Sequence, residues 1–429
     1  MSEKLLAYCA VILLVAAFSF TEVDRGGTEA AGLSTILLVS RVIPMMVVVA
    51  FCFAAVPVRR YFQFFQSMGR APSLFWAWYA GVAVVSGFVS GITPAWSAWK
   101  SIEVLTVVIW AAAVMVHAQR TRSVRVMERI FSYLVIASYF VCLWSIAEIF
   151  REGYSIQDYI FRGFRMSTNF PHINAITLTI ISLFALAGGI LLTNRIGVPM
   201  RIMIMLPLGL VFALSRSRTG ILALFTVAFF AMKTSTISKG KKLTLIALSL
   251  TVVSAVVLSS AVREEIRLTS WEEFKRGAGR IQAESGGSGW KDTARLIMKQ
   301  PAIGLGFVIV KRFLDNDHLA VDNFALQALV TAGFVGAGPM LVYSIWVFFR
   351  WLGRVRMRDP ASRRLAEMGM LTTCLGFVKS ITTNGMSVYG VSLLLFIYGA
   401  LALRMLNDSV IYVEAPEMSM EDPELASVN

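Results

Sequence analysis

Charged residues are scarce in this chain, since Asp, Glu, Lys and Arg make up only 15% of its 429 residues, against about 25% in soluble domains. Hydrophobic residues make up 57% of the chain. Apolar stretches of about 20 residues recur from end to end, and each can cross ~30 Å of hydrocarbon. This pattern excludes an ordinary soluble protein. The stretches are also too continuous for barrel strands, so the sequence predicts an all-α, polytopic membrane protein.

Cysteine and histidine are rare too, with four and three residues in the whole chain. The cysteines are scattered through apolar segments and are interpreted as small buried residues, not as disulfide partners or metal ligands. No DxD-like acid pair and no HExxH motif occurs. The SGGSG stretch at 285–289 lacks Walker spacing and is not interpreted as a phosphate loop. We therefore expect no cofactor and no obligatory metal.

About twelve membrane spans are predicted. They are 5–20, 33–56, 74–95, 99–118, 129–149, 173–193, 199–215, 218–234, 242–261, 323–350, 365–383 and 387–406. The first lacks an A-x-A-like cleavage site and is expected to be a retained helix. The sequence contains no 20–50-residue repeat and no obvious inverted repeat. It predicts one transmembrane domain over 1–408 and a disordered acidic tail over 409–429.

Basic residues exceed acidic residues, 40 against 26, and give a formal net charge of +14. Five short connections hold much of this charge, from VRRYFQFFQSMGR after the second span to RWLGRVRMRDPASRR after the tenth. Short basic connections face the cytoplasm in helical membrane proteins. This orientation signal explains the charge better than nucleic-acid binding does, and it predicts that both termini are cytoplasmic.

Three segments of the opposite, outer face are basic despite this rule: 150–172, 215–218 and 262–322. The longest is predicted to be a subdomain of two or three short helices that lie on the membrane. Because basic residues are normally scarce on this face, their presence predicts an anionic ligand. Guanidinium groups suit a phosphate, since they stay charged and bind its oxygens in a forked geometry.

Four arginines of these outer segments are candidates for that role. Arg216 and Arg218 belong to the turn SRSRTG, Arg280 lies in the long segment, and Arg165 stands among aromatic residues in YIFRGFRMSTNF. The alternative is that these side chains extend from helix ends to ordinary lipid headgroups.

Three titratable residues of the outer face are candidate bases. His172 precedes the sixth span, His318 precedes the tenth, and Asp322 follows His318 by four residues. A general base must titrate near the working pH, which His or a perturbed Asp can do. The alternative for each is a polar helix cap.

Charged residues within the predicted spans are Arg41, Lys100, Glu103, Glu148 and Lys379. Charge inside a membrane is costly and marks functional sites. Lys100 and Glu103 have i,i+3 spacing and are expected to pair. Arg41 and Lys379 are predicted toward the outer side, as secondary candidates for binding the anion.

Four stretches between residues 160 and 340 form an ordered set of motifs. They are FRMSTNFPHINAIT, SRSRTGILAL, GRIQAESGGSGWKDTARLIMKQPAIGLGF and VDNFALQALVTAGFVG. In order, in spacing and in the layout of spans, this set resembles the O-antigen ligase and polymerase superfamily. In the last motif Asn323 is followed by nine residues and then by Gly333-Phe-Val-Gly336. Ligases of the family have His where this chain has Asp322, and polymerases vary more there, so the resemblance favours a polymerase.

The resemblance implies an inverting, metal-independent glycosyltransferase at the periplasmic face of a bacterial inner membrane. The donor would be a glycan linked to undecaprenyl diphosphate. The acceptor would be another lipid-linked repeat unit for a polymerase, or lipid A–core for a ligase. The implied site residues are Arg218 and Arg280 for the diphosphate, Arg216 and Arg165 in support, and Asp322 or His318 as the base. Expected partners are membrane lipids and a chain-length regulator protein, and no nucleic acid.

Two other functions fit parts of the sequence. A transporter also fits twelve spans with both ends inside, but the missing inverted repeat and the long outer segment disfavour it. A non-catalytic protein that binds a lipid-linked glycan would use the same arginines without a base.

Overall fold

Helices and two very short strands make up the computed structural model, which describes residues 2–18, 41–56, 66, 72–91, 94–151, 168–169, 172–173, 175–192, 198–215, 218–233, 289–307, 323–353, 360–382 and 386–407. These residues form twelve helices and two strands. In chain order they are α1 (Ser2–Phe18), α3 (Ile43–Ala55), α5 (Leu74–Ser90), α6 (Pro94–Thr121), α7 (Arg125–Arg151), β1 (Thr168–Asn169), β2 (His172–Ile173), α9 (Ala175–Leu192), α10 (Val198–Ser215), α11 (Arg218–Lys233), α15 (Gly289–Lys299), α17 (Phe324–Gly353), α18 (Pro360–Thr382) and α19 (Val391–Asn407).

Apolar helices confirm the prediction of a helical membrane protein. Every predicted span coincides with a helix except 242–261, which lies outside the described residues. Four helices within the described part of the chain are long and apolar enough to cross a membrane: Pro94–Thr121, Arg125–Arg151, Ala175–Leu192 and Phe324–Trp351. Shorter apolar helices include Ile43–Ala55, Leu74–Ser90 and Val391–Asn407. Of the predicted outer segment 262–322, the described part contains one helix, α15, and the stretch 300–307.

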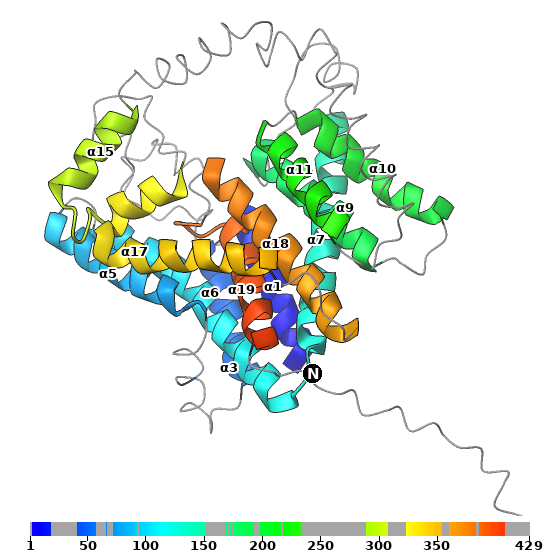
Figure 1. Cartoon of the computed structure of the whole chain (residues 1–429), viewed down its shortest axis with the longest axis horizontal. Helices are drawn as coiled ribbons and strands as arrows, with labels where there is room; N and C mark the ends of the chain where they lie inside the picture. The colour runs from blue at the N-terminus through cyan, green and yellow to red at the C-terminus, as the bar shows by residue number, and fades with distance from the viewer. Residues whose placement is uncertain are drawn as a thin grey trace, which may run out of the picture.

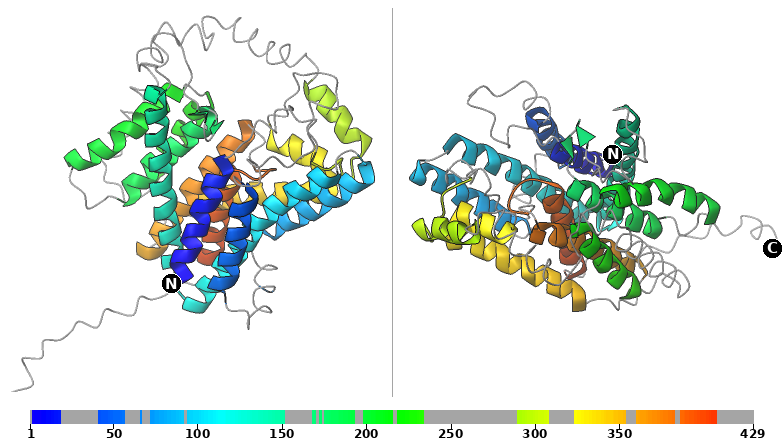
Figure 2. Two further views of the ribbon diagram at one scale, coloured as in Figure 1. Left: turned by 180° about the vertical axis from the view of Figure 1, so that it is seen from behind. Right: turned by 90° about the horizontal axis from the view of Figure 1, so that it is seen from above.

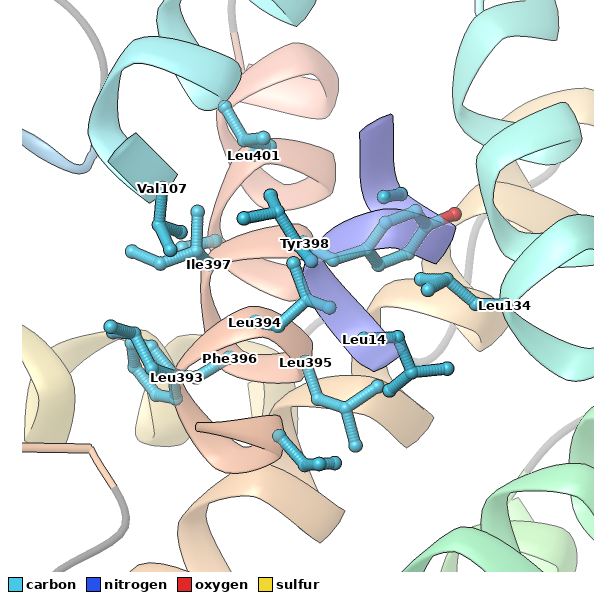
Figure 3. Close-up of a cluster of buried hydrophobic side chains, with 14 of the residues drawn as sticks. Leu14, Val107, Leu134, Leu393, Leu394, Leu395, Phe396, Ile397, Tyr398 and Leu401 are labelled. Atoms are coloured by element: carbon cyan, nitrogen blue, oxygen red, sulfur yellow. The ribbon is translucent and has the colours of Figure 1, made fainter. Parts of the chain in front are cut away.

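The centre of the molecule is α19, whose residues are almost all buried. Figure 3 shows its side chains packed against Leu14 of α1, Val107 of α6 and Leu134 of α7. α18 lies directly against α19, where a β-carbon on Gly399 would come within 2.6 Å of the Gly369 carbonyl oxygen. Small residues at such contacts let two helices approach closely, which is how helices associate within membranes.

Two groups of helices flank this centre (Figures 1 and 2). On one side α9 and α10 pack with α7, α11 packs with α9, and α11 and α9 also contact α18. On the other side α5 and α17 lie together, at a steep angle to α1, and α15 packs on α17. α17 also contacts α18. α18 is therefore the element that touches both flanking groups.

The turn at 386–390 is inserted into the bundle. Met386, Ser387 and Tyr389 are buried. Trp76 Nε1 donates to the Met386 carbonyl oxygen at 3.1 Å, and the Tyr79 hydroxyl donates to the Ser387 carbonyl oxygen at 3.0 Å. The turn therefore enters the protein and meets α5 there.

Two details complete the comparison with the predicted fold. The helical fold class is confirmed, and the two-residue strands β1 and β2 pair antiparallel, with Asn169 opposite His172. The next helix begins at Ala175. Cysteines behave as predicted: Cys9, Cys52, Cys142 and Cys374 are all buried and free.

Candidate functional site

A break in α17 is the centre of the candidate site. Gly333 has φ +58° and ψ −168°, which divides the helix into a short limb, Phe324–Ala332, and a long limb that begins at Phe334. The predicted span over 323–350 is therefore a helix that is broken at Gly333. Glycine accepts a positive φ without a steric cost. A break also frees backbone groups that must be hydrogen-bonded within a membrane.

The segment Pro301–Phe307 supplies the missing hydrogen bonds. The backbone N–H groups of Phe334 and Val335 donate to the carbonyl oxygens of Pro301 and Ala302, at 2.8 and 2.9 Å. In return, the N–H groups of Leu305 and Gly306 donate to the carbonyl oxygens of Val330 and Thr331, at 2.7 and 2.9 Å. The two limbs are thus joined through this segment. The PAIGLGF and GFVG motifs, about 30 positions apart in the sequence, form one structure.

Glycines make this approach possible. A β-carbon on Gly304 would come within 2.6 Å of Gly333 N, and one on Gly306 within 2.6 Å of Gly87 Cα. A β-carbon on Gly333 would collide with the Ala302 carbonyl group. Gly304 and Gly306 also have positive φ, +74° and +85°. We refer to Gly87, Gly304, Gly306 and Gly333 as the glycine junction.

Three serines of α5 and α6 bind the same segment. Ser86 Oγ donates to the Ile303 carbonyl oxygen, and Ser90 Oγ donates to that of Leu305 at 2.8 Å. Ser97 Oγ accepts from Phe307 N at 2.9 Å. The sequence analysis missed these serines. The pattern that could have revealed Ser86 and Ser90 is their spacing with Gly87, since these small residues fall within one turn of an apolar helix. Small residues in this pattern mark close helix contacts in membranes.

The short limb of α17 anchors both neighbouring parts of the predicted outer segment. On one side, Leu296 and Ile297 of α15 pack with Leu305 and Val330 in a small apolar cluster. On the other side, Asn323 caps the limb, since its Oδ1 accepts from Ala325 N at 2.9 Å. Its Nδ2 donates to the Ile381 carbonyl oxygen of α18 at 3.5 Å.

The stretch 308–322, which carries His318 and Asp322, lies outside the described residues, but both of its attachment points are described. Phe307 follows Gly306, which is bonded to Thr331, and Asn323 begins the same limb. From Asn323 to Thr331 a helix rises about 12 Å, at 1.5 Å per residue. The described residues on either side of 308–322 therefore both lie at the short limb of α17.

A buried group of charges lies at the starts of α3 and α6. Arg41 Nη1 donates to Glu103 Oε1 at 2.8 Å, and Lys100 Nζ donates to Glu103 Oε2 at 3.2 Å. The Lys100 ammonium also lies 4.7 Å from the centre of the Trp96 ring. Arg41 is 1%, Glu103 0% and Lys100 7% exposed. The predicted Lys100–Glu103 pair is confirmed, and Arg41 joins it. We refer to Arg41, Trp96, Lys100 and Glu103 as the charge cluster.

The other predicted site residues fall into two sets. The first lies outside the described residues and contains Asp322, His318, Arg280, Arg216 and Arg165. In the second set, Arg218 is the first residue of α11 and His172 is the first residue of β2. Lys379 is buried in α18, two residues before Ile381, the partner of Asn323.

The described residues Ser215 and Gly220 of the SRSRTG stretch lie against α9. Ser215 Oγ, at the end of α10, shares a hydrogen bond of 2.5 Å with Thr179 Oγ1 of α9. A β-carbon on Gly220 would collide with the same threonine. The views agree that α9, α10 and α11 lie on the opposite side of α18 from the glycine junction (Figures 1 and 2). Three of the predicted residues can be compared in position. Arg41 contacts Glu103, and Lys379 lies in α18 near the Asn323 end of α17. Arg218 begins α11, which lies on the other side of α18.

No group of three or more His, Cys, Asp and Glu side chains gathers as a metal site within the described parts of the chain. Because His318 and Asp322 lie outside those parts, independence from metal stays a prediction. Comparison of the sequence with protein-family models and with curated proteins gives no match.

Proposed function

We propose that the chain is an inverting glycosyltransferase that polymerises undecaprenyl-diphosphate-linked repeat units without a metal. In this proposal the protein lies in a bacterial inner membrane with both termini in the cytoplasm. The reaction takes place at the periplasmic ends of the helices. The proposal starts from the four motifs that resemble the O-antigen ligase and polymerase superfamily.

One observation carries the proposal. Parts of two of those motifs, PAIGLGF and VTAGFV, bind each other through four backbone hydrogen bonds at the break of α17. Broken helices are tolerated in membranes where protein covers the freed backbone groups, and they recur at substrate sites of membrane proteins. The described residues on either side of the segment that carries His318 and Asp322 both lie at the short limb of α17. Two stretches selected for their motif pattern therefore belong to one physical unit.

The proposed step is a displacement at the anomeric carbon. The acceptor hydroxyl oxygen attacks that carbon, its proton passes to Asp322 or His318, and the bond to the diphosphate oxygen breaks. Negative charge then grows on the leaving diphosphate. Arg218 and Arg280, supported by Arg216 and Arg165, would stabilise this charge, and one such donor is worth roughly 3–4 kcal/mol of transition-state energy.

A ligase is the second candidate, because it shares the donor and the leaving group. It differs only in the acceptor, lipid A–core in place of a second repeat unit. Asp322, at the position where ligases of the family have His, favours the polymerase. A transporter remains the third candidate, and it would move solute without forming a glycosidic bond.

Product analysis with purified, reconstituted protein tests these candidates. Proteoliposomes are supplied with lipid-linked repeat units, with and without lipid A–core. A polymerase makes longer lipid-linked glycans without lipid A–core, whereas a ligase makes only the lipid A–core product. Arg218→Ala and Arg280→Ala should each lower the rate at least 100-fold. Arg350→Ala, at an exposed position in the long limb of α17, is the matched control and should keep full activity. Normal polymer yield from both outer-face variants would refute the proposal.

A further inference from the structure

The short limb of α17 has one apolar face and one polar face. Its apolar face packs with α15, since Val330 belongs to the small apolar cluster that α15 helps to form. Its polar face carries Asn323, Gln327 and Thr331. These residues are four positions apart, so they form one row along the helix. Polar side chains in a membrane helix are costly and mark functional sites, so each member of the row needs an explanation.

The two ends of the row have structural partners. Asn323 caps the limb and binds α18. Thr331 is fully buried, and its side chain lies beside the Tyr79 hydroxyl of α5. That hydroxyl donates its hydrogen to the Ser387 carbonyl oxygen at 3.0 Å. Its oxygen can therefore only accept, and the Thr331 hydroxyl is the donor beside it.

This chain of donors orients the amide of Gln327. Because the Thr331 hydroxyl gives its hydrogen to Tyr79, Thr331 Oγ1 accepts from Gln327 Nε2, at 3.3 Å. The amide nitrogen, and not its oxygen, thus faces Thr331. Gln327 Oε1 is left outside the chain, and no donor within the described parts of the protein is bonded to it. Gln327 is 7% exposed, so this acceptor is almost completely buried.

A purely structural role does not explain Gln327. Amide side chains in membrane helices can join two helices by hydrogen bonds, as Asn323 does here. The hydrogen bond of Gln327 stays within its own limb and joins it to no second helix. A buried acceptor without a donor is also destabilising. A leucine at this position would avoid that cost, so the amide is better explained by a ligand that supplies the donor.

The chemistry of the row selects a neutral ligand that carries hydroxyl groups. Gln327 Oε1 needs a donor, which phosphate oxygens at neutral pH do not supply in general. Nε2 has two hydrogens, and Thr331 takes one of them. The amide therefore offers an acceptor and a donor side by side, which matches two neighbouring hydroxyl groups of a sugar ring. Gln327 lies about 6 Å along the helix from Asn323, at 1.5 Å per residue.

We propose that Gln327, oriented by Thr331 and Tyr79, binds hydroxyl groups of the glycan substrate. This inference rests on the proposed function and deepens it, since it assigns the sugar a contact that is separate from the arginines for the diphosphate. Gln327 is a substrate-binding residue in it. Thr331 and Tyr79 are positioning residues, because they act on the sugar through the amide.

Binding of the water-soluble repeat unit, released from its lipid by mild acid, tests the inference without turnover. Saturation-transfer NMR measures its affinity for the full chain in detergent. Gln327→Met keeps the length of the side chain but removes the acceptor and the donor, so binding should weaken about 10- to 100-fold, the effect of two neutral hydrogen bonds. Leu326→Met, on the same limb, is the matched control and should bind like the wild type. Equal affinity in Gln327→Met and the wild type would show that only water meets this amide. That result, or a wild type that binds no repeat unit, would overturn the inference.

A second pair of variants tests the orientation of the amide. Thr331→Val keeps the shape of the side chain but removes the hydroxyl, so glycan binding should weaken about 3- to 10-fold. Thr331→Ser restores the hydroxyl and should bind within about 2-fold of the wild type. Normal binding by Thr331→Val and weak binding by Thr331→Ser would mean that Thr331 acts through packing alone, and would overturn the orientation. Thermal unfolding of every variant separates loss of binding from loss of the fold, and this pair decides the question if Gln327→Met unfolds.

Two further arms identify the ligand class and separate this inference from the proposed function. Trialanine, whose N–H groups could also bind Gln327 Oε1, should not compete with the repeat unit, and competition would overturn the assignment to a sugar. Gln327-dependent glycan binding by a protein that makes no polymer would reject the proposed function and leave this inference standing. An active polymerase whose KM for the lipid-linked repeat unit is unchanged in Gln327→Met would support the proposed function and reject this inference.

Discussion

The glycine junction and the charge cluster meet on α6, where Ser97 binds Phe307 beside the junction and Lys100 belongs to the cluster. The junction joins its segments by backbone hydrogen bonds and has no room for side chains at Gly304, Gly306 and Gly333. The cluster joins α3 to α6 through long side chains and opposite charges. The junction depends on the absence of side-chain atoms at its glycines, and the cluster depends on the attraction between opposite charges.

This difference predicts two kinds of failure. At Gly304 and Gly333 an added β-carbon meets backbone atoms, and backbone cannot move aside as a flexible side chain can. In the cluster a change of shape is tolerable, but a change of charge leaves an ion buried without compensation. Removing the carboxylate that two buried cations share is therefore costly.

The largest effect is expected from Glu103→Gln. The variant keeps the shape of the side chain but leaves Arg41 and Lys100 buried beside a neutral amide. Breaking a buried pair in this way costs about 3–5 kcal/mol. Thermal unfolding in detergent measures the effect, and Lys100→Met is the control because it preserves the Arg41–Glu103 pair. Equal losses in the two variants would mean that charge balance does not govern the cluster.

Gly333→Ala should give the next largest effect. An alanine at position 333 would have to keep the positive φ of +58°, and its β-carbon would collide with the Ala302 carbonyl group. Together these should cost roughly 2–4 kcal/mol. Gly338→Ala is a matched control in the same helix, since a β-carbon there has nothing within 4 Å. It should stabilise the protein by about 0.5–1 kcal/mol, because alanine is the better helix former. Similar unfolding temperatures for both variants would show that the junction tolerates added atoms.

The two regions also differ in how far the sequence predicts them. Lys100 and Glu103 were predicted to pair because they are three residues apart on one helix. Arg41 could be recognised only as a charge within a span, since its partner is 62 positions away and no local pattern connects them. The lengths of the apolar stretches predict most helices, because each must cross the same thickness of hydrocarbon.

The break in α17 shows why the junction was not predicted. Pro339 is the stronger local signal for a kink, yet it lies inside the continuous long limb. The helix breaks at Gly333 because Pro301 and Ala302, about 30 positions earlier, accept the hydrogen bonds of the long limb there. The motif comparison identified both stretches but could not reveal their contact. The positions of His318, Asp322 and Arg280 stay predictions.

Asn323 holds the start of the short limb of α17 through an uncharged polar side chain, so it differs from both the glycine junction and the charge cluster. Its side chain caps the short limb through Oδ1 and binds the Ile381 carbonyl oxygen through Nδ2. Asn323→Ala removes both contacts and should cost about 1 kcal/mol, the usual value of a helix cap. Asn323→Asp keeps an acceptor for the cap and loses only the longer bond, so its stability should stay within about 0.5 kcal/mol of the wild type. Thermal unfolding of the two variants in parallel measures the difference. An equal loss in both would mean that the link to α18, and not the cap, holds this end of the limb, and the loop of Asp322 would then depend on α18 as much as on the junction.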